Sequence, residues 1–111
     1  MNWINLTNEE YLHQIKLKSN TKPQVIFKHS TRCSISSMAK SRLERSTQTN
    51  EIDFYFLDLI KYRLISNKIA EEFNVYHESP QILIIKNGEC IYDESHSGID
   101  MRIIIEQSMA A

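Results

Sequence analysis

The sequence predicts one α/β domain, residues 1–111, in which helices flank a central four-stranded mixed sheet. Segments of helical periodicity alternate with short apolar runs in the order αβαβαββα. This alternation is typical of parallel strands joined by right-handed crossover helices. The last two strands are joined by Asn87-Gly88, the dipeptide most typical of a two-residue hairpin turn. With a hydrophobic fraction of 41%, the chain can bury one core without disulfides or a metal.

The first half of the chain predicts two helices and one strand. The first helix is expected from about Thr7 to Lys18, because Thr7 and Glu10 have the spacing of a capping box. The run Gln24–His29 contains three consecutive apolar residues and predicts a buried strand. From Cys33 the apolar period becomes helical, with one face formed by Ile35, Met38, Ala39 and Leu43.

The second half predicts two helices and three strands. The aromatic-rich run Asp53–Asp58 predicts a central strand. A third helix should end near Asn74, a residue type that readily takes the left-handed conformation after a helix. The hairpin strands are expected over 82–86 and 89–93. A last helix is predicted from the cap candidates Ser97 and Asp100 and from the apolar residues Met101, Ile104 and Ile105.

Composition excludes several classes of function. The net charge of −1 argues against a nucleic-acid partner or a charged membrane surface. No apolar run approaches the roughly 20 residues of a membrane span, and residues 1–5 do not resemble a secretory signal, so we expect a cytoplasmic monomer. Cys33 and Cys90 are far apart and there is no Cys-x-x-Cys. Two free thiols are therefore expected, with no metal site.

Cys33 is the best candidate for a reactive group. It stands where a predicted strand passes into a predicted helix, and the unpaired amides at a helix N-terminus favour the thiolate. Lys28, His29 and Arg32 lie within five residues of it, and no Asp or Glu occurs between positions 24 and 42. The alternative is a buried, unreactive cysteine.

The motifs around Cys33 resemble those of a known family. Cys33-Ser-Ile-Ser36 occupies the place of the thioredoxin Cys-x-x-Cys motif, and Ser79-Pro80 precedes the hairpin where thioredoxins carry a cis-proline. The chain resembles the bacillithiol-system redox proteins (YtxJ-like monothiol bacilliredoxins of thioredoxin fold) from about residue 3 to 105. The matching segments are 28–36, 58–60, 65–67, 77–81 and 95–96. Ser34 stands where the family usually has proline.

The resemblance implies thiol–disulfide exchange that removes a bacillithiol-like thiol from cysteines of other proteins. No cofactor is bound, and the low-molecular-weight thiol is a co-substrate. Cys33 would be the nucleophile, and because Ser36 replaces the resolving cysteine, an external thiol must reset the mixed disulfide. Ser36 can donate a hydrogen bond to the thiolate, or can simply favour the helix start. A cis bond at Pro80 would present the Ser79 backbone to an extended substrate.

Charged side chains near Cys33 are further candidates for substrate binding. Lys28 and Arg32 could bind a carboxylate of the low-molecular-weight thiol. His29, His77 and His96 could tune or transfer protons, and the loop of His96 should border the active face.

Two other readings of the chain stay open. A non-catalytic binding module would hold a partner in the groove beside Pro80, since fold does not fix function. A redox sensor or stress factor would need the same Cys33 thiol. Cys90 and Trp3 are expected to have structural roles.

Overall fold

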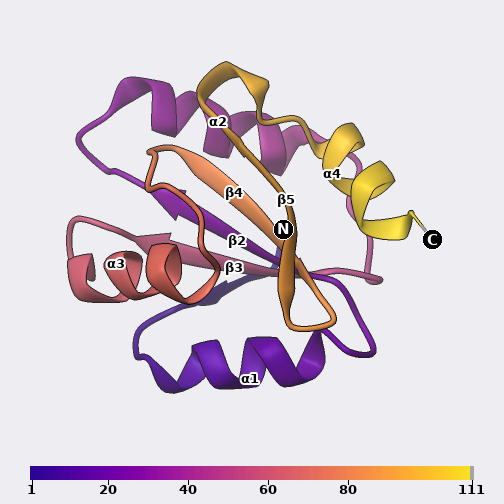
Figure 1. Ribbon diagram of the computed structural model, residues 1–111. Helices are drawn as coiled ribbons and strands as arrows, with labels where there is room; N and C mark the ends of the chain where they lie inside the picture. Colours follow the sequence, from indigo (N-terminus) through magenta and orange to yellow (C-terminus); the bar gives the residue numbers. More distant parts are fainter. Residues whose placement is uncertain (111) are drawn as a thin grey trace.

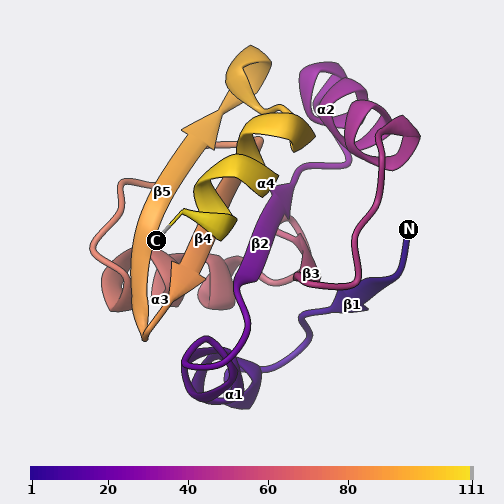
Figure 2. The ribbon, with the colours of Figure 1, turned by 90° about the vertical axis from the view of Figure 1, so that its right-hand side faces the viewer.

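A five-stranded mixed sheet separates two helical layers in the computed structural model, which describes residues 1–110 (Figure 1, Figure 2). The strands are β1 (Trp3–Asn5), β2 (Gln24–His29), β3 (Asp53–Asp58), β4 (Gln81–Lys86) and β5 (Glu89–Ser95). The helices are α1 (Glu10–Lys18), α2 (Ser34–Arg45), α3 (Arg63–Glu72), α4 (Met101–Met109) and the short 3₁₀ helix η1 (His96–Gly98).

The strand order β1-β3-β2-β4-β5 places the ends of three neighbouring strands, β3, β2 and β4, at one end of the sheet. β1, β3 and β2 are parallel, whereas β4 is antiparallel to both β2 and β5. The carboxyl ends of β2 and β3 therefore meet the amino end of β4, where Lys28 lies between Leu57 and Gln81. In Figure 1 the turn into α2 and the start of β4 lie at this same end of the sheet.

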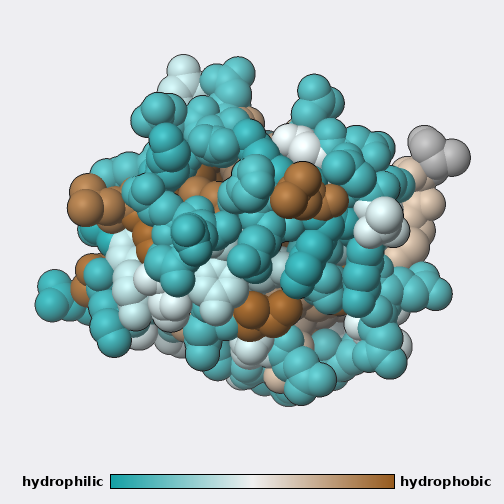
Figure 3. Space-filling model, turned by 90° about the horizontal axis from the view of Figure 1, so that it is seen from below, coloured by the Kyte–Doolittle hydropathy of each residue, from teal (hydrophilic) through white to brown (hydrophobic). Residues whose placement is uncertain are grey.

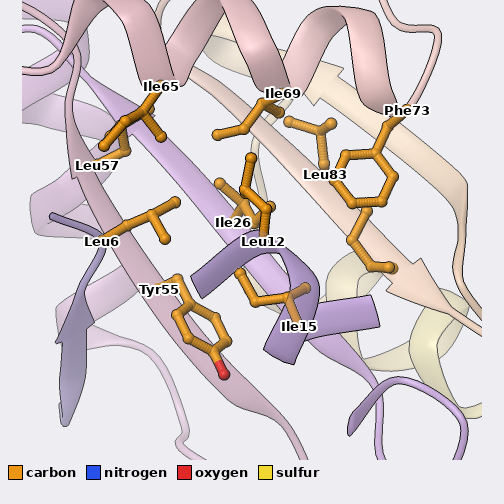
Figure 4. Close-up of a cluster of buried hydrophobic side chains, with 11 residues drawn as sticks. Leu6, Leu12, Ile15, Ile26, Tyr55, Leu57, Ile65, Ile69, Phe73 and Leu83 are labelled. Atoms are coloured by element: carbon orange, nitrogen blue, oxygen red, sulfur yellow. The ribbon is translucent and has the colours of Figure 1, made fainter. Parts of the chain in front are cut away.

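Each face of the sheet carries its own hydrophobic cluster, because successive strand side chains point to opposite faces. Ile26 and Tyr55 pack under α1 and α3, with the residues shown in Figure 4. Val25 and Phe27 pack under α2 and α4. Both faces of β2 are thus covered, and all six of its residues are buried. This strand is the rigid support from which the chain leads to Cys33.

Most elements agree with the sequence predictions. β2 and β3 have the expected bounds, and Asn74 has the expected positive φ of 54°. At the hairpin turn, Asn87 and Gly88 have φ values of 53° and 78°, the two positive angles that a type I′ turn requires. Asp100 caps α4 by accepting a hydrogen bond from the Arg102 amide at 2.9 Å.

Two predictions about the helices and strands are wrong. The sheet has a fifth strand, β1, which is too short to show an alternating pattern in the sequence. The helix α1 starts at Glu10, so Thr7 and Glu10 form no capping box; instead the Asn8 side chain accepts the Glu10 amide at 3.0 Å.

Trp3 explains how so short a strand is held at the sheet edge. Its ring stacks on Phe27 at 5.6 Å between centroids and meets Phe54 and Phe56 edge-on. The indole N–H donates to the Glu44 carboxylate of α2 at 2.8 Å. Trp3 is therefore a structural residue, and what it stabilises is an edge strand.

The face below α1 is predominantly hydrophilic, with its apolar side chains in small separate patches (Figure 3). None of the helices in residues 1–110 has the length and hydrophobicity of a membrane-spanning segment.

Candidate active site

Cys33 occupies the N-cap position of α2. Its backbone is extended, with φ −114° and ψ 118°, and its carbonyl accepts the Ser37 amide at 3.1 Å in the first helical turn. Its own amide donates to Ser30 O at 3.2 Å, which closes the short turn after β2. The side chain is a free thiol and is partly exposed. Cys33 thus stands at the start of α2, and in the described part of the chain its side chain forms no hydrogen bond with the first-turn amides of the helix.

Ser36 is fully buried one turn further along α2. Its hydroxyl oxygen accepts the Ser30 amide at 3.0 Å and lies 2.7 Å from His29 Nδ1. No hydrogen bond joins it to the Cys33 sulfur in the part of the chain that the structure describes. Ser36 therefore ties the end of β2 to α2, and in this way holds the turn that carries Cys33.

His29, a candidate for proton transfer and substrate binding, has a buried side chain, so the structure does not present it to a substrate at the surface. It is the last residue of a strand covered on both faces, and its ring lies 5.3 Å from the Phe56 ring. Burial, followed by the charge of Lys40, lowers the pKa of His29, while Asp58 opposes this shift. His29 is therefore a neutral packing residue, linked to Ser36.

Lys28 is also turned inward, which contradicts its expected role in binding a carboxylate at the surface. Its side chain is fully buried. The ammonium donates to Ser66 O of α3 at 3.2 Å and to His77 Nδ1 at 3.2 Å. Burial lowers the pKa of Lys28 to about 8. We refer to Lys28, Ser66 and His77 as the Lys28 cluster.

The segment 76–80 leads from this cluster to the start of β4, at the same end of the sheet as the turn that carries Cys33. The Ser79–Pro80 peptide bond is cis, and Pro80 is buried. The Gln81 side chain holds the segment at two points, since Nε2 donates to Tyr76 O at 2.9 Å and Oε1 accepts the Glu78 amide at 3.4 Å. The Ser79 hydroxyl oxygen is buried and has no hydrogen-bond partner within residues 1–110.

His96 and Arg32 remain at the surface. The His96 amide donates to Pro80 O at 3.1 Å, and its ring Nε2 lies 3.7 Å from a Glu78 carboxylate oxygen. The Arg42 guanidinium of α2 donates to His96 O at 3.3 Å and to Ile99 O at 3.1 Å. Arg42 thereby holds η1 against α2, and Arg32 is exposed immediately before Cys33.

Two apolar side chains close to Cys33 in the sequence are exposed on α2, which the sequence did not predict. Ile35 and Met38, expected in the core, are 49% and 61% exposed on the first turns of α2. The buried face of this helix is formed by Ser36, Ala39 and Leu43. Tyr76, at the start of the segment 76–80, is 94% exposed.

Cys90 differs from Cys33 in its surroundings. It lies on β5 against the core cluster under α1 and α3, and its thiol donates to Tyr92 O at 3.4 Å. Burial raises the pKa of the Cys90 thiol to about 11. Among the described residues, no three His, Cys, Asp or Glu side chains are grouped to hold a metal ion.

The burial of Lys28 predicts a stability that depends on pH. The folded state lowers the pKa of Lys28 from 10.5 to about 8, so the unfolded chain binds more protons between these values. The free energy of unfolding of the wild type, relative to Lys28→Met, should therefore rise from pH 8 to 10.5 by up to about 3 kcal/mol. Urea titrations of both proteins at several pH values measure it. A difference that stays constant across this range would contradict the assignment.

Comparison with known proteins agrees with this geometry. The family model described as monothiol bacilliredoxin BrxC matches residues 4–104. A solved structure described as a candidate oxidoreductase with a thioredoxin fold is 29% identical, with a TM-score of 0.82 over 94% of this chain and 91% of that one. The thioredoxin Mala s 13 of Malassezia sympodialis is 21% identical, with a TM-score of 0.75 over 98% and 92%. Fasciola hepatica thioredoxin is 16% identical, with a TM-score of 0.73 over 94% and 97%.

Proposed function

The chain belongs to the monothiol bacilliredoxin BrxC family, and from this premise we propose that it reduces mixed disulfides between proteins and a bacillithiol-like thiol. The family and the thioredoxin-fold oxidoreductase assign a redox function. The observation that carries the finer proposal is the placement of Cys33, a partly exposed thiol at the N-cap of α2. The second cysteine, Cys90, is also partly exposed, but it lies on β5 and packs against the core cluster under α1 and α3.

The reaction takes place in two exchanges. The Cys33 thiolate attacks the sulfur of the small thiol in the mixed disulfide; a bond forms between these two sulfurs, and the target protein leaves as its thiolate and takes up a proton. A second molecule of small thiol, as thiolate, then attacks the same small-thiol sulfur. This step releases a symmetric small disulfide and restores Cys33. In the net reaction, the mixed disulfide and one free small thiol become the target thiol and a symmetric small disulfide, so the target sulfur is reduced and the free small thiol is oxidised.

Ser36 determines the monothiol course of this reaction. A dithiol enzyme would expel its substrate with a second cysteine at that position, but Ser36 carries no thiol and its oxygen is engaged by Ser30 and His29. The mixed disulfide between Cys33 and the small thiol is therefore resolved only by an external thiol. This is why a low-molecular-weight thiol is a co-substrate and why no bound cofactor is needed.

The surroundings of Cys33 suggest how each substrate is held. A protein substrate would extend along the Ser79 backbone and contact the exposed Ile35, Met38 and Tyr76. Arg32 is the exposed cation nearest in sequence to Cys33, and it would bind a carboxylate of the small thiol.

Treatment of the purified protein with bacillithiol disulfide tests the proposal. We expect one adduct on Cys33 and none on Cys90, reversed by free bacillithiol, as measured by peptide mass spectrometry. A Cys33 that stays unmodified would refute the enzyme and favour a binding module. An adduct that forms without multiple turnovers on a protein mixed disulfide would identify a sensor instead.

A further inference from the structure

The Lys28 ammonium is buried, and no carboxylate of the described residues forms an ion pair with it. Its side chain is fully buried, and within residues 1–110 its ammonium forms hydrogen bonds only with the Ser66 carbonyl oxygen and the His77 ring. Every ion pair that the structure gives a lysine joins partly exposed side chains. Burying an ammonium with neutral partners is costly, so Lys28 indicates a functional role more than a stabilising one.

The contacts of Lys28 fix the state of the His77 ring. An ammonium only donates hydrogen bonds, so His77 Nδ1 must accept and the ring proton must be on Nε2. The Ser66 hydroxyl, 3.2 Å from the same Nδ1, donates as well. The charged groups that face His77 are Lys28 from β2, Arg63 from α3 and Glu78 from its own segment. His77 is exposed as a residue, but partial desolvation of its ring, followed by the charges of Lys28 and Arg63, lowers its pKa, which agrees with a neutral ring.

Through this ring the Lys28 cluster anchors the segment 76–80. The Gln81 side chain and the His96 amide hold the backbone of the segment, and the exposed His96 ring lies 3.7 Å from the Glu78 carboxylate at the surface. Among these contacts, the hydrogen bond between Lys28 and His77 is the one that joins a buried side chain of β2 to a side chain of the segment. Lys28 therefore joins β2, which leads to Cys33, to the segment that carries Ser79.

We propose that Lys28 is a positioning residue for thiol–disulfide exchange, because through His77 it holds the segment 76–80 where a protein substrate pairs with the Ser79 backbone. The inference rests on the proposed function, which assigns this segment to substrate binding. If the segment is in the competent conformation less often, the apparent dissociation constant of a protein substrate rises in proportion. A small disulfide, which reaches Cys33 without pairing as a strand, is unaffected.

The variants His77→Leu and His77→Asn form a matched pair. Asparagine keeps an acceptor oxygen close to the position of Nδ1, whereas leucine leaves the Lys28 ammonium without this partner. With a protein mixed disulfide, His77→Leu should raise KM about tenfold at unchanged kcat, and His77→Asn should stay within about twofold of the wild type. The rate at which Cys33 reacts with cystine should be the same in all three proteins.

Amide hydrogen exchange gives a readout that does not depend on activity. His77→Leu and Lys28→Met should both speed exchange in residues 76–81 and leave β3 unchanged, and His77→Asn should resemble the wild type. Equal KM values in the leucine and asparagine variants, or unchanged exchange in 76–81 of His77→Leu, would overturn the proposal. A wild type that reacts with neither substrate would overturn the proposed function instead, and exchange would still decide the role of Lys28.

Discussion

Cys33→Ser is expected to lower the turnover of a protein mixed disulfide by at least about a thousandfold, because the hydroxyl that replaces the thiol is not a nucleophile toward disulfide sulfur. The Ser30, Ser36 and Ser37 contacts that hold the turn do not involve the sulfur, so the folded structure should persist. Release of the target thiol, followed with a fluorescent protein mixed disulfide and excess small thiol, measures the rate.

Cys90→Ser is the matched control, since it removes the other thiol. Burial raises the pKa of Cys90 to about 11, so this thiol is protonated at neutral pH and should not contribute to turnover. We expect this variant to retain turnover within about twofold of the wild type. Substantial activity in Cys33→Ser, or a loss of activity in Cys90→Ser, would show that Cys33 at the α2 N-terminus is not the catalytic thiol.

The sequence predicted the parts of the fold whose signals are local. An apolar run bounded by polar residues located β2 and β3, and Asn87-Gly88 located the hairpin. β1 has no such signal: it is held by pairing with β3 and by Trp3 on an aromatic cluster drawn from β2 and β3. Contacts between distant segments stabilise it, and a linear pattern cannot show them.

The position of Cys33 was predictable, but the directions of its neighbours were not. Charge suggested that Lys28 and His29 lie at the surface, whereas a strand covered on both faces places every side chain inside. The run Val25-Ile-Phe27 predicted a buried strand, because it lacks the alternation of a half-exposed strand, but that prediction was not extended to the polar side chains of Lys28 and His29. His77 could not be found in the same way, since only the folded chain brings it to Lys28.

The buried face of α2 was misassigned for a related reason. Ile35 and Met38 are apolar and at helical spacing, so they were expected in the core. The face that is buried contains Ser36, whose hydroxyl is satisfied by the Ser30 amide and by His29. A polar residue that finds its partners inside rotates the helix relative to its apolar pattern. The rotation leaves two apolar side chains at the surface beside Cys33.

Phe27→Ala is expected to lower the free energy of unfolding by about 3–5 kcal/mol, because it removes a fully buried aromatic ring from a core strand. The ring lies between Trp3 and His29, at 5.6 Å and 5.9 Å, so its loss should also loosen β1 at the sheet edge. Urea denaturation followed by the fluorescence of Trp3, the one tryptophan of the chain, measures both effects.

Tyr76→Ala is the control for Phe27→Ala, since Tyr76 is an aromatic residue that is 94% exposed. It should change stability by no more than about 0.5 kcal/mol. A loss below about 1 kcal/mol in Phe27→Ala would mean that the site collapses around the missing ring, and that β1 does not depend on it. The larger loss would show that the Phe27 ring is a well-packed part of the aromatic cluster of β1, β2 and β3. In that case the strand that leads to Cys33 is held in place by a contact between the chain's third residue and its twenty-seventh.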